Sequence, residues 1–578
     1  MKKKVSDQLV EMLINAGIKR IYAITGDSLN ELNDSVRRTP EIEWIHVRNE
    51  EAGAFAASAD AQLSGIACCA GSSGPGHVHL VNGLYDAHRS GAPVLAIAST
   101  CATKEFGSIY FQETNVIKLF DDCSHYTQVA ANAIQLPRMA QAAIQTAIHK
   151  RGVTVLGFPG DVAGLEAVNI DSAQENYFCW ANICPIPEQL QELADLINQH
   201  QKICIFAGIG ASDAHDEVVQ LAARLAAPVG YSFRGKMSIS HNNPYEVGMT
   251  GLLGLPAAYH AMHESDLVLL LGTDFPYTPF YPHEKTIVQV DIKPENLGRR
   301  AKLSMGLYGD IGTTVRALLP LLDQKTDNSF LESMIYIRQK DLENLQTYVK
   351  DKGRINFLHP EAVADQLDKI AAEDAIFTCD TGMCNVWSAR YITANGKRDM
   401  IGSFIHGSMA NAMPHAIGAA LACPDRQVVA MCGDGGISML LGDLATIKQY
   451  NLNIKIIVFN NRALGMVKLE MEVMGLPDFQ VDMIDPDFAA VATAMGIKGI
   501  TINDPEKIAE GLTEAFAHKG PVLVNALTDE AALAMPPRIE LKMMKGMALS
   551  MTKMMLGGKA EEVLATVKSN YKHLKEII

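Results

Sequence analysis

The most specific chemical pattern in the sequence lies between residues 427 and 461. An apolar run, QVVAMC, leads into Gly433-Asp434-Gly435-Gly436, and a second apolar run, IKIIVF, ends at Asn460-Asn461. Glycines after a strand let the backbone approach a diphosphate closely, and the helix that follows directs its N–H groups at the phosphate. Asp434 and Asn461 add a carboxylate and an amide oxygen, which are ligands that Mg²⁺ prefers. The pattern predicts a magnesium-diphosphate site.

The apolar runs that flank this motif belong to a series that continues through most of the chain. They show no alternation of apolar and polar residues, which is typical of strands buried on both faces of a parallel sheet. Between them lie segments with helical spacing, such as EEAGAFAASADAQL and LLGDLATIKQY. The sequence therefore predicts an α/β protein with doubly wound parallel sheets. The runs are IYAIT, IACCAG, PVLAIAS, TVLGF, ICIFAG, LVLLLG, TIVQVD, VVAMCG and IKIIVFN.

Two breaks in this rhythm divide the chain. Residues 175–188 hold two prolines and no periodic pattern, which favours a linker. Residues 321–354 are polar with helical spacing, and about three domains are expected for 578 residues. We place the domains at 1–178, 190–330 and 355–530, followed by a tail at 531–578.

The first and third predicted domains share a faint echo. A strand followed by Gly26-Asp27-Ser28 resembles the strand followed by Gly433-Asp434-Gly435. Aspartate and glycine are common turn residues, so a similarity this short is compatible with chance.

Composition limits the classes of partner. The chain carries 50 basic and 65 acidic residues, a formal net charge of −15, which argues against nucleic acid because phosphate backbones are repelled. Its 11 cysteines include no C-x-x-C pair, which indicates reduced thiols in a cytosolic protein. The first 20 residues have the pattern of an amphipathic helix, not a signal peptide, and no run of about 18 apolar residues could span a bilayer.

The interval from Gly435 to Asn460, with its flanking strands, resembles the cofactor motif of thiamine-diphosphate enzymes. Further stretches resemble the pyruvate oxidase and pyruvate dehydrogenase (quinone) family over almost the whole chain. The clearest are TGDSLN, AQLSG, NPYEVGMTGLLG, GSMANAMP and QVVAMCGDGG. The resemblance implies three cofactors, which are thiamine diphosphate, Mg²⁺ and FAD.

The resemblance also implies which residues form the thiamine-diphosphate site. Glu50 matches the glutamate that acts on the aminopyrimidine ring, although a helix dipole alone also favours a glutamate there. Met409 matches the side chain that bends the cofactor, although a methionine near glycines is more often core filler. The implied catalytic residues are Glu50, Phe111, Gln112, Met466 and Glu470. The implied cofactor contacts are Glu50, Asn82, Gly407, Ser408, Met409, Asp434, Gly435, Gly436, Asn461, Arg462, Ala463, Leu464 and Gly465, with Asp434, Asn461 and Ala463 also as metal ligands.

Segments of the middle third resemble the flavin-binding part of the same family. The run KICIFAG leads into Gly208-Ile209-Gly210 without the third glycine of the dinucleotide fingerprint. Arg234 suits a flavin diphosphate and Asp291 a ribose hydroxyl, whereas an empty scaffold, as in non-oxidative relatives, is the alternative. The implied flavin contacts are Gly208, Arg234, Thr250, Gly251, Leu252, Leu253, Thr273, Asp274, Phe275, Pro276, Tyr277 and Asp291.

The resemblance implies oxidative decarboxylation of pyruvate to acetate and CO₂, with electrons passed from FAD to a membrane quinone. Three alternatives stay open: a pyruvate oxidase that uses O₂ and phosphate to give acetyl phosphate and H₂O₂, an enzyme like acetolactate synthase, and a catalytically silent binding protein. Asn49 stands where the family has histidine, and Met466 where it has a phenylalanine linked to electron transfer. Both departures bear on the rate and control of the oxidative step.

Assembly and location also follow from the resemblance. Family members build the site between two chains, and Glu50 and Asp434 fall in different predicted domains. The resemblance therefore implies at least a homodimer and favours a tetramer.

The tail contains two helical patterns, a methionine-rich one at 541–556 and a basic amphipathic one near the C-terminus. The second carries an apolar stripe that could dock on the protein itself or lie on an anionic membrane surface. The resemblance favours the membrane, so we expect a cytoplasmic protein peripheral to the inner face of the cell membrane. The stripe is Val563, Val567, Tyr571, Leu574 and Ile578, with Lys568, Lys572 and Lys575 largely off it.

Overall fold

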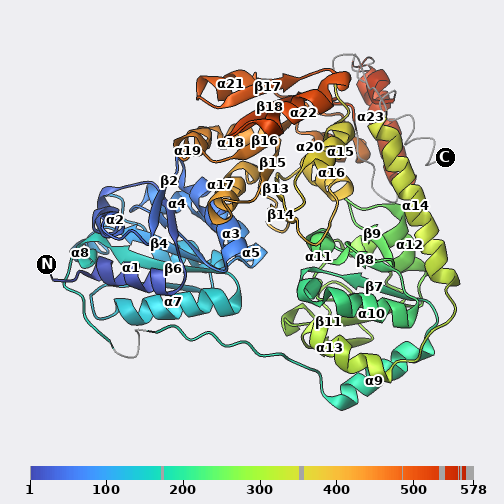
Figure 1. Ribbon diagram of the computed structural model, residues 1–578, viewed down its shortest axis with the longest axis horizontal. Coiled ribbons are helices and arrows are strands. Elements are labelled where there is room, and N and C mark those ends of the chain that lie inside the picture. Colours follow the sequence, from blue (N-terminus) through green and yellow to red (C-terminus); the bar gives the residue numbers. More distant parts are fainter. Residues whose placement is uncertain are drawn as a thin grey trace.

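A computed structural model describes residues 2–170, 175–350, 357–484, 486–532, 541–556, 559, 561 and 563–567. Within them the chain forms three parallel sheets of six strands each, and helices pack around each sheet (Figure 1). The N-terminal sheet is blue in the figure, the middle sheet green, and the C-terminal sheet yellow to red. The predicted α/β, doubly wound fold is confirmed.

The strands have the following bounds. The N-terminal sheet contains β1 (Arg20–Ala23), β2 (Glu43–His46), β3 (Ala67–Gly71), β4 (Val94–Thr100), β5 (Tyr126–Val129) and β6 (Val153–Pro159). The middle sheet contains β7 (Ile203–Ala207), β8 (Val229–Tyr231), β9 (Glu246–Met249), β10 (Leu267–Leu271), β11 (Thr286–Asp291) and β12 (Met305–Tyr308). The C-terminal sheet contains β13 (Ile376–Cys379), β14 (Asp399–Gly402), β15 (Val428–Gly433), β16 (Ile454–Asn460), β17 (Lys498–Ile502) and β18 (Val522–Leu527).

The helices follow the same three-part division. The first part contains α1 (Val5–Asn15), α2 (Asn30–Arg37), α3 (Glu50–Ser64), α4 (Pro75–His79), α5 (Val81–Ser90), α6 (Val116–Phe120), α7 (Leu136–Lys150) and α8 (Gly160–Ala163). The second contains α9 (Pro187–Gln199), α10 (His215–Leu225), α11 (Lys236–Ile239), α12 (Pro256–Glu264), α13 (Ile311–Leu318) and α14 (Ser329–Val349). The third contains α15 (Pro360–Ile370), α16 (Met383–Tyr391), α17 (Ala412–Ala422), α18 (Asp434–Met439), α19 (Leu444–Gln449), α20 (Gly465–Val473), α21 (Phe488–Ala494), α22 (Ile508–Ala517) and α23 (Leu541–Leu556).

Both faces of the N-terminal sheet are buried, as the unbroken apolar runs predict. The adjacent residues Cys68 and Cys69 on β3 are fully buried, yet they pack into different hydrophobic cores. Successive side chains of a strand point to opposite faces, so a sheet covered on both sides needs apolar residues at every position. This geometry explains why the runs show no alternation.

Strand order places the loops that can bind ligands. The middle sheet has the order β12-β11-β10-β7-β8-β9. Strands β8 and β9 are added on one side of β7 and strands β10 to β12 on the other, so the order of the strands reverses between β7 and β10. The C-terminal sheet has the order β14-β13-β15-β16-β18-β17 and reverses between β13 and β15. In open parallel sheets ligands bind at such reversals, beyond the carboxyl ends of the strands. A ligand is therefore expected to bind at the loops after β7 and β10, or at those after β13 and β15.

The N-terminal sheet, β2-β1-β3-β4-β6-β5, has the same strand order as the C-terminal sheet. The sequence echo does not reflect this equivalence, because Gly26-Asp27 follows the first strand of its sheet and Gly433-Asp434 follows the third. The structural counterpart of Gly26-Asp27 is instead the turn at Asp380 after β13. The interpretation of the echo as chance is confirmed.

Helices α3 and α17 bring the N-terminal and C-terminal sheets together. One hydrophobic core contains Phe55 and Val94 from the first sheet region together with Ile417 and Val428 from the third. The helices touch backbone to backbone, since a Cβ at Gly418 would lie 2.0 Å from the carbonyl oxygen of Ala56. Only glycine permits this approach.

Gly418→Ala should separate α3 from α17 and lower the free energy of unfolding by about 1–3 kcal/mol, the range for an overpacked core. Gly312→Ala is the matched control on α13, because the nearest atom to its new methyl, at 3.2 Å, is the flexible end of Arg316. That control should be neutral or stabilising. Urea unfolding measures both, and equal stability of the Gly418→Ala variant and the wild type would contradict the packing described here.

Candidate functional site

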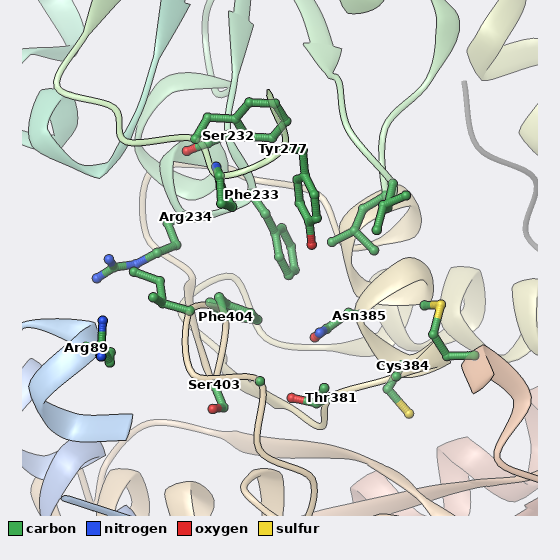
Figure 2. A pocket seen from close by; sticks show the side chains of 18 of the residues that line it. Arg89, Ser232, Phe233, Arg234, Tyr277, Thr381, Cys384, Asn385, Ser403 and Phe404 are labelled. Atoms are coloured by element: carbon green, nitrogen blue, oxygen red, sulfur yellow. The ribbon is translucent and has the colours of Figure 1, made fainter. Parts of the chain in front are cut away.

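A cavity of about 1270 Å³ lies between the middle and C-terminal sheets and is also bordered by a few residues of the N-terminal part. Figure 2 shows Phe233 and Tyr277 on the side of the middle sheet, with Phe404, Asn385 and Thr381 facing them from the C-terminal part. The Phe233 and Phe404 rings meet edge to face with centroids 4.5 Å apart. Sites for one small ligand usually measure about 300–1,000 Å³, so this cavity has room for more than one group.

The predicted diphosphate loop lines the cavity at the ends of β15 and β16. Asp434 lies at the start of α18, and its carboxylate accepts hydrogen bonds from the backbone N–H of Gly435 at 2.7 Å and of Arg462 at 2.6 Å. The second contact ties the turn after β15 to the turn after β16. Asn461 is in that second turn, and its Oδ1 accepts from the N–H of Ala463 at 3.2 Å. The two predicted metal ligands therefore lie at the same sheet edge.

A second loop, missed by the sequence analysis, lies beside the first. Residues 381–385, at the start of α16, line the same cavity after β13. Gly382 has φ of 123°, a conformation that favours glycine. The Oγ1 of Thr381 is buried and has no hydrogen-bond partner, so this polar atom is available to a ligand. The segment TGMCN carries no glycine-rich fingerprint, and only its position at the reversal of strand order could have indicated it.

A third wall is formed by residues 403–409 between β14 and α17. Gly407 has φ of 77°, and the Met409 side chain reaches to 3.1 Å from the point where a Cβ of Gly435 would lie. Met409 therefore contacts the diphosphate loop and borders the cavity. Ser408 faces away from it, and its Oγ accepts from the Asn82 amide on α5 at 2.9 Å.

The middle-sheet side of the cavity includes the loops after β9 and β10, together with residues that follow β7, β8 and β11. Thr250 is buried, and its Oγ1 has no partner. Gly251, with φ of 88°, packs its backbone on the Phe275 ring, where an added Cβ would lie 2.7 Å from the ring. Gly208 packs in the same way under Gly272, where an added Cβ would lie 2.5 Å from the carbonyl oxygen of Gly272. These two glycines shape the wall without lining it.

Charged groups surround this part of the cavity. Burial lowers the pKa of Arg234 to about 10, and its Nη2 donates to the carbonyl oxygen of Ser90 on the N-terminal side at 2.6 Å. Burial raises the pKa of Asp291, which accepts from the N–H of Lys293 at 2.9 Å. Asp274 is already paired with Arg300 at 2.7 Å. Arg234 and Asp291 are thus better placed than Asp274 to meet a ligand.

Helix α16 is clamped at its far end by the middle domain. The buried Lys236 ammonium on α11 donates to the carbonyl oxygens of Ser388 at 3.1 Å, Ala389 at 2.6 Å and Ile392. Burial lowers the pKa of Lys236 to about 7. In return, the Arg390 guanidinium donates to the carbonyl oxygen of Leu253 at 3.2 Å. Helix α16, which begins at the Thr381 loop beside the predicted diphosphate loop, therefore ends on the loops of the middle sheet.

Helix α20 begins directly after the Asn461 turn and borders the cavity with Met466 and Glu470. Burial, and next the charge of Glu470, raise the pKa of Tyr277 across the cavity. The methionine-rich α23 packs against α20, with Met547 contacting Leu469 and the Ser550 hydroxyl donating to the carbonyl oxygen of Leu476 at 2.8 Å. The first half of the predicted tail is thus docked on its own chain.

The rest of the tail is only partly described. Val563 is buried, whereas Tyr571, Leu574, Ile578 and the three lysines of the basic pattern lie outside the described residues. Among the described residues, no helix is long and apolar enough to cross a membrane.

Four residues expected from the N-terminal domain, Glu50, Asn82, Phe111 and Gln112, do not line the cavity. Glu50 is buried at the start of α3, where it contacts His79 Nδ1 at 3.0 Å. Phe111 is 76% exposed on a surface loop, and the carbonyl oxygen of the neighbouring Gln112 accepts from the Ser73 hydroxyl. These residues gather at the carboxyl edge of the N-terminal sheet, away from the walls of the cavity within this chain.

The remaining expected residues divide as follows. Those that line the cavity are Arg234, Thr250, Leu252, Leu253, Thr273, Asp274, Phe275, Pro276, Tyr277, Asp291, Gly407, Met409, Asp434, Gly435, Gly436, Asn461, Ala463, Leu464, Gly465, Met466 and Glu470. Those that do not line it are Glu50, Asn82, Phe111, Gln112, Gly208, Gly251, Ser408 and Arg462.

Comparison with known proteins agrees with this layout. Three family models match the chain: the N-terminal thiamine pyrophosphate binding domain of thiamine pyrophosphate enzymes at 3–121, their central domain at 190–318, and their C-terminal thiamine pyrophosphate binding domain at 380–526. A putative thiamine pyrophosphate-containing protein of Bacillus subtilis, YdaP, is 34% identical over 100% of this chain and 99% of its own length. Pyruvate oxidase of Lactiplantibacillus plantarum is 30% identical over 90% of this chain and 87% of its own. The large subunit of acetolactate synthase of Parasynechococcus marenigrum is 29% identical over 89% and 86%.

The residues present fit the cofactors that this family implies. The partnerless Thr381 hydroxyl and the N–H groups at the start of α18 suit a diphosphate. Asp434 and Asn461 supply oxygen ligands to Mg²⁺, which commonly takes its other ligands from phosphate and water. The partnerless Thr250 hydroxyl and the buried Arg234 guanidinium suit a second phosphorylated group on the opposite wall.

Thr381→Val separates a ligand role from a structural role. Because the buried hydroxyl has no partner, its replacement by a methyl group should leave the free energy of unfolding of the cofactor-free protein unchanged or higher. If the hydroxyl donates to a diphosphate, affinity for thiamine diphosphate should fall about ten-fold or more. Urea unfolding and calorimetric titration measure the two effects, and unchanged affinity would remove Thr381 from the site.

Proposed function

The chain belongs to the thiamine pyrophosphate enzymes, and we propose that it decarboxylates pyruvate oxidatively to acetate and CO₂, passing the electrons through FAD to a membrane quinone. The observation that carries this proposal is the single cavity, which joins the diphosphate loop at Asp434 to the middle-sheet loops at Thr250 and Tyr277. Two phosphorylated cofactors bound at these walls would have their reactive rings in one enclosed space. That proximity is what electron transfer from a decarboxylated substrate to a flavin requires.

In this proposal Asp434, Asn461 and the backbone carbonyl of Ala463 hold Mg²⁺, and the turn at Gly435 and Gly436 receives the diphosphate. Arg234 and Asp291 meet the diphosphate and ribose of FAD. The domain limits expected from the sequence, 1–178, 190–330, 355–530 and a tail at 531–578, form part of the same proposal.

When bound, thiamine diphosphate supplies the nucleophilic carbon for the keto group of pyruvate, and FAD supplies the two-electron acceptor. The residues of the chain bind and orient these groups. Glu50 is the carboxyl group that exchanges a proton with the aminopyrimidine ring, and the imidazole of His79, 3.0 Å away, fixes the orientation of that carboxyl group. Asn49 caps α3 by accepting from the N–H of Glu51 at 2.9 Å, so this departure from the family pattern still holds Glu50 at the helix start.

A second copy of the chain completes the site in this proposal. Glu50, Phe111 and Gln112 do not line the cavity of their own chain, while Phe111 and the nearby Ile109 are 76% and 96% exposed. A homodimer places these residues against the cavity of the partner subunit, and two dimers give the expected tetramer.

The acceptor distinguishes this function from its nearest rivals. Relatives named pyruvate oxidase and acetolactate synthase match the chain at 30% and 29% identity. If the purified protein contains FAD, anaerobic pyruvate should bleach the flavin absorbance, and a quinone should restore it faster than air does. Restoration by O₂ with phosphate-dependent H₂O₂ would instead indicate the oxidase, and a flavin that never bleaches would indicate the synthase or a silent binding protein.

Glu50→Gln should retain affinity for thiamine diphosphate and Mg²⁺ but lower the rate of CO₂ release from pyruvate about 10²–10⁴-fold, the usual contribution of a general acid–base group. Asp60→Asn is a control on the same helix, because Asp60 is equally buried and binds Arg20 and Tyr22 away from the site. Calorimetry measures affinity, and trapped CO₂ measures rate. Near-normal turnover by Glu50→Gln would refute the assigned role.

We also propose that the chain end binds the inner face of the cell membrane. Removal of residues 560–578 leaves α23 in place together with Lys559, whose ammonium lies 3.0 Å from the buried Asp478. The truncated protein should lose binding to vesicles that contain phosphatidylglycerol, which carries negative charge, while the full chain co-sediments with them. Unchanged co-sedimentation after truncation would exclude this role for the tail.

A further inference from the structure

A chain of buried polar groups lies beneath the diphosphate loop, and neither the cavity nor the chemistry proposed above uses it. It starts at Asp86 on α5, passes through His415 on α17 and Asn411 before that helix, and ends at Asp380 after β13. All four side chains are at most 1% exposed. Buried polar groups this far from solvent need partners, and successive members of the chain contact one another through hydrogen bonds, whereas Asp86 Oδ1 is buried without a hydrogen-bond partner.

The last member contacts the diphosphate loop directly. One carboxylate oxygen of Asp380 accepts from the N–H of Gly433 at 3.3 Å. A Cβ at Gly436 would lie 1.8 Å from the same oxygen, so the loop rests on the carboxyl group. The other oxygen accepts from the N–H of Asn411 at 3.0 Å and from its amide Nδ2 at 3.2 Å. Asp380 thus fixes the position of the turn at Gly433–Gly436 relative to the end of β13.

The middle members connect Asp380 to the N-terminal domain. The Asn411 amide oxygen accepts from the N–H of Ser403 at 3.2 Å and lies 3.1 Å from His415 Nδ1. The other ring nitrogen, Nε2, lies 3.1 Å from Asp86 Oδ2. Oxygen atoms therefore face both nitrogens of the ring, one from Asp86 and one from Asn411. The orientation of the Asn411 amide is fixed from both sides.

The same amide steadies a second wall of the cavity. Asn411 Nδ2 also donates to the carbonyl oxygen of Ser408 at 2.7 Å, directly before Met409. A rotated Asn411 amide would lose its bonds to Asp380 and to Ser408 together. The position of both walls therefore depends on His415, and the position of His415 depends on Asp86.

We propose that Asp86, His415, Asn411 and Asp380 are positioning residues that hold the Gly433–Gly436 turn in the shape that binds thiamine diphosphate. Affinity for the cofactor then depends on Asp86, a residue that belongs to the N-terminal domain and lines no part of the cavity. This role presupposes that the turn binds thiamine diphosphate, as proposed above.

The test is the dissociation constant of thiamine diphosphate for the cofactor-free full chain at saturating Mg²⁺, measured by calorimetry. Asp86→Asn and Asp380→Asn, which keep side-chain size, should each weaken binding at least about ten-fold, the effect expected from leaving a buried hydrogen-bonding group unmatched. Asp60→Asn is the control, since it removes another buried carboxylate of the N-terminal domain, and it should bind within about two-fold of wild type. His415→Gln replaces Asp86→Asn if that variant does not fold, and the same loss is expected.

Two further readings separate positioning from a general structural effect. At saturating cofactor, CO₂ release from pyruvate by Asp86→Asn should stay within about three-fold of wild type, because the residue touches no reacting group. In the double variant Asp86→Asn/Asp380→Asn, the loss of affinity should be smaller than the product of the single losses, because residues that act through one chain are not additive.

The results for the variants test the positioning role, and the result for the wild type tests the proposed function. Wild-type affinity in Asp86→Asn, or losses that multiply within about a factor of two, would overturn the positioning role while leaving cofactor binding intact. A wild-type protein that binds no thiamine diphosphate would overturn the proposed function itself.

Discussion

The site depends on how helix α16 is held. The loop at its start, which contains Thr381, lines the cavity beside the predicted diphosphate loop, and its end is fixed by Lys236, whose Nζ donates to three carbonyl oxygens there. The last carbonyl oxygens of a helix have no partner within the helix, so these hydrogen bonds stabilise the end of α16. Because Lys236 belongs to the middle domain, a shift of that domain moves the wall of the diphosphate site.

A second tie fixes the same site from the other direction. The N-terminal and C-terminal sheets share one hydrophobic core through α3 and α17, and the fully buried Asp86 and His415 side chains contact each other between the two parts. The diphosphate turn therefore lies between two domain contacts, one through α16 and one through α17. Because such a turn is already ordered before a ligand binds, the entropic cost of ordering it on binding is small.

The sequence predicted the interior of each sheet better than its edges. Every apolar run that was identified forms a strand, and all of those strands are internal. The strands β2, β5, β9, β12, β14 and β17 were missed, and these are the edge strands of the three sheets. An edge strand is partly exposed, as the mixed burial of β2 and β12 illustrates, so it need not be an apolar run. Three internal strands were also missed: the short β8 and β13, and the six-residue β18.

The site was predictable where chemistry and sequence spacing coincide. Asp434 and Asn461 follow adjacent strands, so their spacing along the chain alone indicated a shared edge. Thr381 and Asp380 could not be found in this way, because their role comes from the reversal of strand order between β13 and β15. Glu50 was identified from resemblance, and its burial beside His79 gives no sign within one chain of what it would meet across a subunit contact.

The most direct measurement is a calorimetric titration of the cofactor-free protein with thiamine diphosphate, carried out with Mg²⁺ and again with Mg²⁺ chelated. Saturable binding of one cofactor per chain that requires the metal is the result expected if Asp434 and Asn461 hold a magnesium-bridged diphosphate. Absence of binding with Mg²⁺ present, or binding of equal strength without it, would contradict that assignment.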